Sequence, residues 1–419
     1  MRYRSAGAGM TLLTAFAVPG LSQQGPVDPV SFEGPFDTLQ PLMDEPGEAE
    51  VADHGAGYYV PSNPDTILWG YLPNRDSTPV LTVPSGSVVT FDTVSHEGIL
   101  EDQGRDPIAY FETFGVGEDA VIEDAVTITG SEIEHDFSAD GPHIVTGPIA
   151  IEGAEPGDVL MVETLGIVPR TGYGVISNRH GKGALPGEFP ETPEPAADAS
   201  ADNPEAFNNV SIFVPIVERD GTWYGQLHNA ESAMVEYPIR PFMGLMGVAA
   251  DTSDPVPSVP PSIYGGNMDI NEFGAGSTVY FPINVTGALF YTGDPHAAQG
   301  DGEVALTAQE HSMRPTFRLT LMKAGDAALP VPGGFTQPIG ETDEHWISIG
   351  LDEDLGEAMK EAVRQAIGLL VAQYDMDRAT ALAYLSAAAD FEVSQVVDKT
   401  KGIHALIPKA DFSAISPDN

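Results

Sequence analysis

Residues 293–310 read GDPHAAQGDGEVALTAQE, a stretch that places several acids and a histidine around a turn-like AAQG run. Asp294 and His296 lie two residues apart before this run, and Asp301 and Glu303 lie two residues apart after it. On an extended strand, residues i and i+2 point to the same face. A hairpin here would therefore bring four nitrogen or oxygen donors to one face. Such donors are the ligands that Zn²⁺ and similar ions take.

The alternative interpretation of this stretch is a solvated acidic hairpin tip, as expected in an acidic chain. Gly293, Gly300 and Gly302 favour an ordered ligand-binding site over a solvated loop. Glycines mark turns, positive φ angles or close backbone approach, and a solvated loop rarely needs so many of them.

Length, charge and cysteine content limit the partners and the chemistry that this protein can have. The 419 residues suffice for one large β-rich domain or two domains. Lys and Arg number 18 against 62 Asp and Glu, a net charge of −44, which excludes nucleic acid and anionic membrane surfaces as partners. We interpret the acid excess as adaptation to salt. The absence of cysteine excludes disulfides and thiol catalysis, and 45 Gly and 36 Pro predict frequent turns and few long helices.

The N-terminus has the pattern of a secretory signal peptide over residues 1–22, because two arginines precede a mostly apolar run without acids. Residues 23–64 are rich in Pro, Gly and acids and predict a loosely packed lead-in. Residues 65–419 then form the main domain. We expect a soluble periplasmic or secreted protein that does not contact the membrane after signal cleavage.

The middle of the chain is strand-like. Segments 85–91, 156–162 and 275–281 share a glycine, a small polar residue and alternating apolar residues, which predicts turns leading into strands and hints at an internal repeat. Further strands are expected at 65–75, 144–151, 210–217, 315–323, 391–397 and 402–407, and an exposed loop at 188–204.

Helical periodicity occurs only near the end of the chain, as a small helical pair within residues 352–390. The first helix is expected over 352–375 with Asp352 as its N-cap, and the second over 379–390. The fold class is therefore mainly β (α+β), a β-sandwich or barrel with repeat-like strands and this pair.

Several further segments place reactive side chains beside glycines at predicted strand ends. His96 and Glu97 follow one strand, His143 precedes another, and His180 lies in an NRHGKG run. A GGNMD run, residues 265–269, precedes the 275–281 strand. A lone histidine in such a place is more often structural than a ligand, but four of them, counting His296, lie beside glycines at strand ends, which makes the two interpretations equal.

Five runs, in order, resemble the acetamidase/formamidase family. They are GPI with EGAEPGDVL (147–160), RPFMG with GV (240–248), GGNMDI (265–270), GDPHAAQGDGE (293–303), and AAD with QVVD (387–398). The resemblance spans roughly residues 81–408. The stretches 89–106 and 178–183 differ from many members, so a substrate other than acetamide or formamide stays open.

The resemblance implies hydrolysis of the carbon–nitrogen bond of a linear amide to a carboxylate and ammonia. It also implies a mostly β fold, a divalent metal and a homodimer or higher homo-oligomer. The chain agrees in lacking a G-x-S-x-G elbow and any cysteine nucleophile.

We expect the metal, Zn²⁺ or alternatively Ca²⁺, to be bound by some of His143, His296, Asp301 and Glu303. It would activate a water and polarise the amide carbonyl. Glu97 or Asp294 would carry the proton, and Asn267 or the backbone N–H groups of Gly265 and Gly266 would stabilise the oxyanion. The substrate-binding residues are expected among His96, His180, Gly265, Gly266 and Asp269.

A second hypothesis comes from another class: a non-catalytic exported protein that uses the same fold to bind a metal or a small ligand. Ammonia release from a panel of short amides distinguishes the two.

Overall fold

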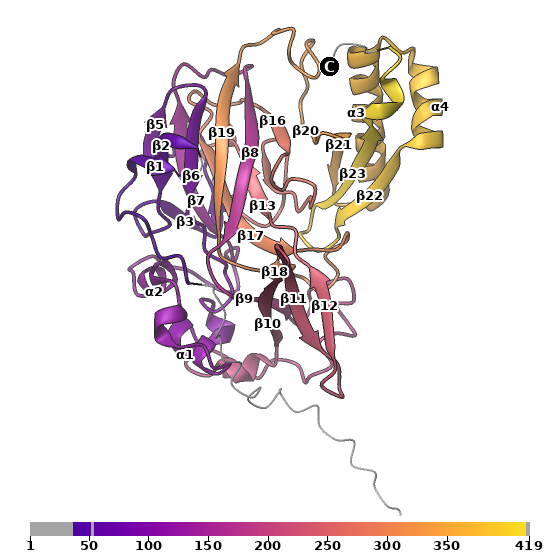
Figure 1. Ribbon diagram of the computed structural model, residues 1–419. Coiled ribbons are helices and arrows are strands. Elements are labelled where there is room, and N and C mark those ends of the chain that lie inside the picture. Colours follow the sequence, from indigo (N-terminus) through magenta and orange to yellow (C-terminus); the bar gives the residue numbers. More distant parts are fainter. Residues whose placement is uncertain (1–36, 52–53, 416–419) are drawn as a thin grey trace, which may run out of the picture.

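A computed structural model describes residues 37–51 and 54–415 and shows two large β-sheets packed against each other (Figure 1). The ten-stranded sheet has the order β1 (Gly47–Val51), β2 (Gly55–Val60), β6 (Ser87–Phe91), β19 (Met313–Met322), β8 (Val159–Pro169), β16 (Thr278–Pro282), β20 (Ile339–Glu341), β21 (His345–Asp352), β23 (Lys401–Pro408) and β22 (Asp390–Gln395).

The eleven-stranded sheet runs β12 (Met234–Pro238), β11 (Thr222–His228), β10 (Val210–Arg219), β9 (Tyr173–Asn178), β18 (Gln309–Glu310), β17 (Phe290–Ala298), β13 (Phe242–Gly247) and β15 (Gly265–Asn267). β7 (Ile144–Ile151) joins it on β17 and itself pairs with β3 (Ile67–Trp69) and β5 (Leu81–Val83). β4 (Tyr71–Leu72) and β14 (Val256–Pro257) form a separate pair. The prediction of a mainly β fold is confirmed, and the described strands form a sandwich without a closed barrel.

The main core lies between the sheets. Phe91 of β6 and Phe317 of β19 pack from one sheet against Phe290 of β17 from the other, with ring centroids 5.5–6.0 Å apart. All three rings are fully buried. Edge-to-face contacts of this kind add to the stabilisation from burying the apolar area. This core fixes the position of β17, the strand that carries Asp294 and His296.

The three glycine-led segments of the sequence all enter the ten-stranded sheet, as β6, β8 and β16. Their glycines, Gly86, Gly157 and Gly276, have φ angles of 86°, 95° and 91°. Only glycine adopts this conformation without strain, which is why the motif recurs before these strands. β8 and β16 pair directly, so the similar segments are neighbours in space.

The predicted C-terminal helical pair is present as α3 (Leu355–Tyr374) and α4 (Arg378–Ala388), which lie together beside β21–β23 (Figure 1). The expected N-cap Asp352 is wrong by two residues. β21 continues through Asp352 in register with Lys401, so Asp354 caps the helix by accepting hydrogen bonds from Gly356 and Glu357. The second helix ends at Ala388, because β22 begins at Asp390.

Two short helices, α1 (Pro107–Glu112) and α2 (Glu123–Thr129), precede the helical pair, contrary to expectation. They are six and seven residues long, too short to show a helical period. No helix of the described residues is long and apolar enough to cross a membrane.

The lead-in predicted over 23–64 differs from expectation where it is described. β1 and β2 are strands of the ten-stranded sheet, and Tyr59 and Val60 of β2 are fully buried. The signal peptide predicted over residues 1–22 lies outside the described residues. Loop 188–204 is mostly exposed, as predicted.

Candidate active site

A buried cluster of three histidines and several carboxylates lies where β17, β18 and β13 meet the segments that flank β6, β7 and β15. β17 contributes Asp294 and His296, and β18 contributes Glu310, which is the strand partner of His296. Each of these side chains is at most 4% exposed. The other members are His96, Glu97, His143, Asn267, Asp269, Glu303 and Asp398, all of them buried.

The first group of donors consists of His96, His143, Asp294 and Glu310. Asp294 Oδ1 lies 3.6 Å from His96 Nδ1 and 3.7 Å from His143 Nε2. Glu310 Oε2 lies 3.8 Å from His96 Nδ1. The Asp294, Glu310 and His96 atoms named here are buried and make no hydrogen bond.

Both histidines of this group are held by their other ring nitrogen. His96 Nε2 lies 3.2 Å from Glu97 Oε1, and His143 Nδ1 is hydrogen-bonded to Ser258 Oγ at 2.9 Å. Metal-ligating histidines almost always have such an outer partner, which fixes the ring and its tautomer. The nitrogen that remains on each ring faces Asp294.

These separations fit a divalent metal ion. Ligand atoms about 2.1 Å from a tetrahedral ion lie about 3.4 Å from one another. The observed 3.6–3.8 Å are close to that value, and two imidazoles with two carboxylates suit Zn²⁺ and related ions better than Ca²⁺. The residues present therefore fit the metal that the sequence led us to expect.

His296 and three further acids adjoin this group. His296 Nε2 lies 3.0 Å from Asp294 Oδ2 and 3.1 Å from Glu310 Oε1. Its Nδ1 faces Asp269, 3.9 Å from Oδ1, and Asp269, His296 and Glu303 form a second set of donors close enough to share an ion. Asp398 completes this side.

The acids of the cluster repel one another. Burial and the charges of Asp398 and Asp294 raise the pKa of Glu303 well above its usual range, and burial with Glu303 and Asp398 does the same for Asp269. Burial also raises the pKa of Asp398 to about 7. Carboxyl groups crowded in this way hold protons or bind a cation.

Glu97 behaves differently from Asp269, Glu303 and Asp398. Burial alone would raise its pKa, but the charge of Arg179 and hydrogen bonds from His96 and Ser177 hold its pKa well below the usual range. Arg179 Nη1 donates to Glu97 Oε1 at 3.0 Å, and Ser177 Oγ donates to Oε2 at 2.6 Å. Glu97 is thus a fixed anion that orients His96. It is poorly suited to the proton-carrying role that we had considered for it.

Gly244 of β13 lies directly against the cluster. A Cβ at this position would be 2.4 Å from Asp269 Oδ1, 2.7 Å from His296 Cε1 and 3.0 Å from Asp294 Oδ2. Only a residue without a side chain leaves these three groups in place.

Most of the predicted site residues meet in the cluster. These are His96, Glu97, His143, Asn267, Asp269, Asp294, His296 and Glu303. Asn267 lies near Asp398 and lowers the pKa of that acid, and its Oδ1 is buried without a hydrogen bond.

Four predicted residues lie elsewhere. Asp301 is exposed and accepts a hydrogen bond from Asn271, because β17 continues to Ala298 and the returning strand is Gln309–Glu310. His180 contacts Asn208 and Thr192 beside loop 188–204. Gly265 donates its N–H to Ser262 O. Gly266 of β15 pairs with Met246 of β13, and Leu72 and Pro261 lie nearest to Gly266. A Cβ built on either glycine would meet none of the cluster residues among its nearest atoms.

Sequence reasoning missed Glu310, Asp398, Arg179, Ser258 and Gly244 as site residues. Glu310 ends the acid-rich stretch 293–310, and Gly244 and Asp398 lie in runs that resemble the family. The sequence therefore offered a signal for these three residues. Nothing local marks Ser258, which reaches His143 from 115 residues away.

A cavity of about 510 Å³ opens beside the cluster. Glu303 is the cluster member that lines it, together with Arg240, Gln299, Asp301 and Gln309. Glu303 therefore connects the buried donors with the cavity.

This chain is similar in sequence to known amidases. Residues 118–256 and 253–414 match the acetamidase/formamidase family. A putative formamidase of Schizosaccharomyces pombe is 27% identical over 284 residues, 57% of this chain and 68% of that protein. An acetamidase of Mycolicibacterium smegmatis is 30% identical over 39% of this chain and 49% of its own, and a formamidase of Methylophilus methylotrophus is 31% identical over 42% and 52%.

Solved structures show the same fold. An acetamidase from Bacillus halodurans aligns with a TM-score of 0.63 at 24% identity, covering 85% of this chain and 99% of that one. A predicted acetamidase/formamidase from Thermoanaerobacter tengcongensis aligns with a TM-score of 0.63 at 23% identity, covering 86% and 98%. This chain belongs to the acetamidase/formamidase family of amidohydrolases.

Proposed function

We propose that this protein hydrolyses a small linear amide to a carboxylate and ammonia with a divalent metal ion, Zn²⁺ by preference. His96, His143, Asp294 and Glu310 would hold the ion. The observation that carries this proposal is the convergence of unpartnered His96 Nδ1, Asp294 Oδ1 and Glu310 Oε2 at 3.6–3.8 Å separations. A bound ion of this kind polarises a carbonyl group and lowers the pKa of a water.

The protein's own residues supply the proton transfers. In the hydrolysis a water oxygen bonds to the amide carbon, the carbon–nitrogen bond breaks, and the nitrogen leaves with a proton. Glu303 lines the cavity, and burial with the charges of Asp398 and Asp294 raises its pKa, so it is the acid placed to take a proton from water and return it to the leaving nitrogen. Asp269 and His296 lie next to Glu303, and Glu97 keeps His96 oriented.

The test pairs metal analysis with ammonia release from amides, formamide and acetamide first and then larger and aromatic amides. His143→Ala is expected to lose both metal and activity. His180→Ala is the matched control, because it also removes a histidine that the sequence placed beside a glycine, yet this one lies outside the cluster. The proposal fails if no amide releases ammonia from zinc-loaded protein. The site fails if His143→Ala keeps its metal and its activity.

We further propose that the chain is exported, on the basis of the basic start and apolar run of residues 1–22. N-terminal sequencing of protein recovered outside the cytoplasm tests this, and an intact N-terminus would contradict cleavage near residue 22.

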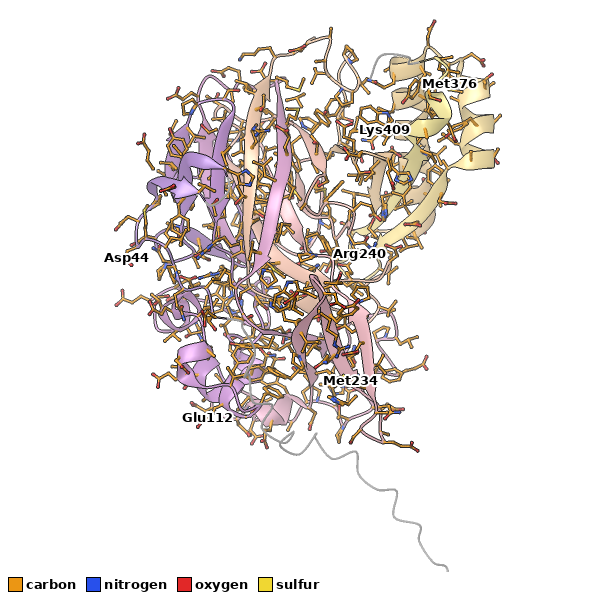
Figure 2. All side chains as sticks on the ribbon, viewed as in Figure 1. Asp44, Glu112, Met234, Arg240, Met376 and Lys409 are labelled. Carbon is orange, nitrogen blue, oxygen red and sulfur yellow. The ribbon has the colours of Figure 1, made fainter. Side chains whose placement is uncertain are left out.

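A homo-oligomer is part of the same proposal. β12 is an edge strand of the eleven-stranded sheet, and its Met234 and Val235 are 49% and 53% exposed. Figure 2 shows Met234 at the lower right margin of the molecule. Apolar edge strands are sites where chains pair. Val235→Lys should shift the mass measured by analytical ultracentrifugation towards the monomer. An unchanged mass would exclude this edge as the interface.

A further inference from the structure

We propose a second metal site, separate from the active site, in which His404, Glu272 and Glu392 bind a zinc-class divalent cation. It lies between the C-terminal strands and the loop between β15 and β16. The donors come from β23, β22 and that loop, and none of them belongs to the catalytic cluster. This inference does not depend on the proposed function.

The three side chains converge on one point. His404 Nε2 lies 3.1 Å from Glu272 Oε2 and 3.5 Å from Glu392 Oε2. One donor atom from each residue lies within 4.8 Å of the others. These separations match the spacing of about 3.4 Å between ligand atoms around a tetrahedral zinc ion.

The orientation of His404 distinguishes this cluster from a surface ion pair. The side chain is fully buried, and its Nδ1 is hydrogen-bonded to Ser394 Oγ at 2.8 Å. This contact leaves Nε2 facing the two glutamates. Nε2 and Glu272 Oε2 are both buried, yet neither makes a hydrogen bond despite their proximity. A buried ring fixed on one side, with its other nitrogen facing two carboxylates, is the arrangement of a metal-ligating histidine.

The glutamate side of the cluster is open to solvent. The side chains of Glu272 and Glu392 are 18% and 33% exposed, so an ion can enter and keep water as a further ligand. Asp301 is a neighbouring acid: burial and its charge raise the pKa of Glu392. One imidazole with carboxylates suits Zn²⁺, Mn²⁺ or Co²⁺, whereas Ca²⁺ takes oxygen ligands.

The site has a structural consequence for the active site. Ser394 O accepts hydrogen bonds from Gly302 N and from Gln299 Nε2, both at 3.1 Å. The loop from Gln299 to Glu303 is thus fastened to β22 beside the cluster. An ion bound at His404 would tie the loop that carries Glu272 to β22 and β23, and β22 is the strand that holds the loop carrying Glu303. In Figure 2, Arg240 lies in this region, below the C-terminal strands.

The test measures zinc bound to the full chain by equilibrium dialysis, after the metal has been stripped with a chelator. Wild type should bind one more zinc per chain than the double variant Glu272→Gln/Glu392→Gln. Glu344→Gln, an exposed glutamate in the turn before β21, is the control and should match wild type. Ser394→Ala keeps all three ligands and should weaken this one site about 10–100-fold.

The two partly exposed glutamates are replaced by residues of nearly the same shape, so the fold should persist, and circular dichroism checks this. The proposal is overturned if the double variant binds as much zinc, as tightly, as wild type. A crystal soaked in zinc that shows anomalous density only at the active site would also overturn it. His143→Ala should lose the catalytic ion and keep the one at His404, so failure of either site can be recognised separately.

Discussion

Replacing Gly244 with alanine should disable the candidate active site while leaving the fold intact. The new Cβ would lie 2.4 Å from Asp269 Oδ1 and 2.7 Å from His296 Cε1. An ordinary carbon–oxygen contact is about 3.5 Å, so one of these groups must move by roughly 1 Å. Both are fully buried in a packed cluster, which gives them little room.

The size of the effect follows from this displacement. A misplacement of about 1 Å costs about 10²-fold in rate, which corresponds to about 2.7 kcal/mol of transition-state stabilisation. Overpacking of a buried position costs about 1–3 kcal/mol of stability, which a folded domain survives. The assay is kcat/KM for ammonia release from formamide or acetamide, with thermal unfolding measured in parallel.

Gly368→Ala is the matched control for this experiment. Gly368 lies within α3, and a Cβ there meets nothing within 4 Å. That variant should keep full activity and gain about 0.5–1 kcal/mol of stability from helix propensity. The reasoning is refuted if Gly244→Ala keeps kcat/KM within about twofold of wild type, because the cluster would then tolerate a shift that its packing forbids.

Three further predictions concern the metal, pH and salt. Ser258→Ala removes the partner of His143 Nδ1 and should weaken metal binding about 10–100-fold in a chelator competition, and unchanged affinity would contradict the role of Ser258. Burial lowers the pKa of His311 to about 4, so the native state binds fewer protons than the unfolded state below pH 6.5. The free energy of unfolding therefore has its full value above pH 6.5, and it decreases as the pH falls towards 4 because the unfolded state then binds a proton that native His311 does not. Wild type should therefore lose roughly 3 kcal/mol more than His311→Gln over that range in urea unfolding, and parallel curves would contradict this. Raising NaCl from about 0.15 M to about 1 M should raise the Tm, because salt screens the repulsion within a chain of net charge −44, and a lower Tm would oppose the salt interpretation.

Patterns along single segments predicted much of this protein. Strand-like segments were recognised where β7, β10 and β19 lie, and the three glycine-led turns located β6, β8 and β16. The two-residue spacing of Asp294 and His296 predicted that they share a face, and the structure places their side chains 3.0 Å apart. Such predictions succeed because the direction of side chains along one strand depends only on local backbone geometry.

Contacts between distant segments were decided by the tertiary structure alone. The hairpin after His296 turns later than its sequence indicates, so Glu310 faces His296 while Asp301 points outward. Ser258 reaches His143 only because β7 and the segment after β14 are brought together, and Gly244 is required only because β13 lies beside β17. Residue spacing fixes neither strand partners nor loop closure, since both depend on packing the two sheets around one core. The sequence by itself therefore determined the fold class, the family resemblance and most members of the cluster, while packing determined which atoms meet.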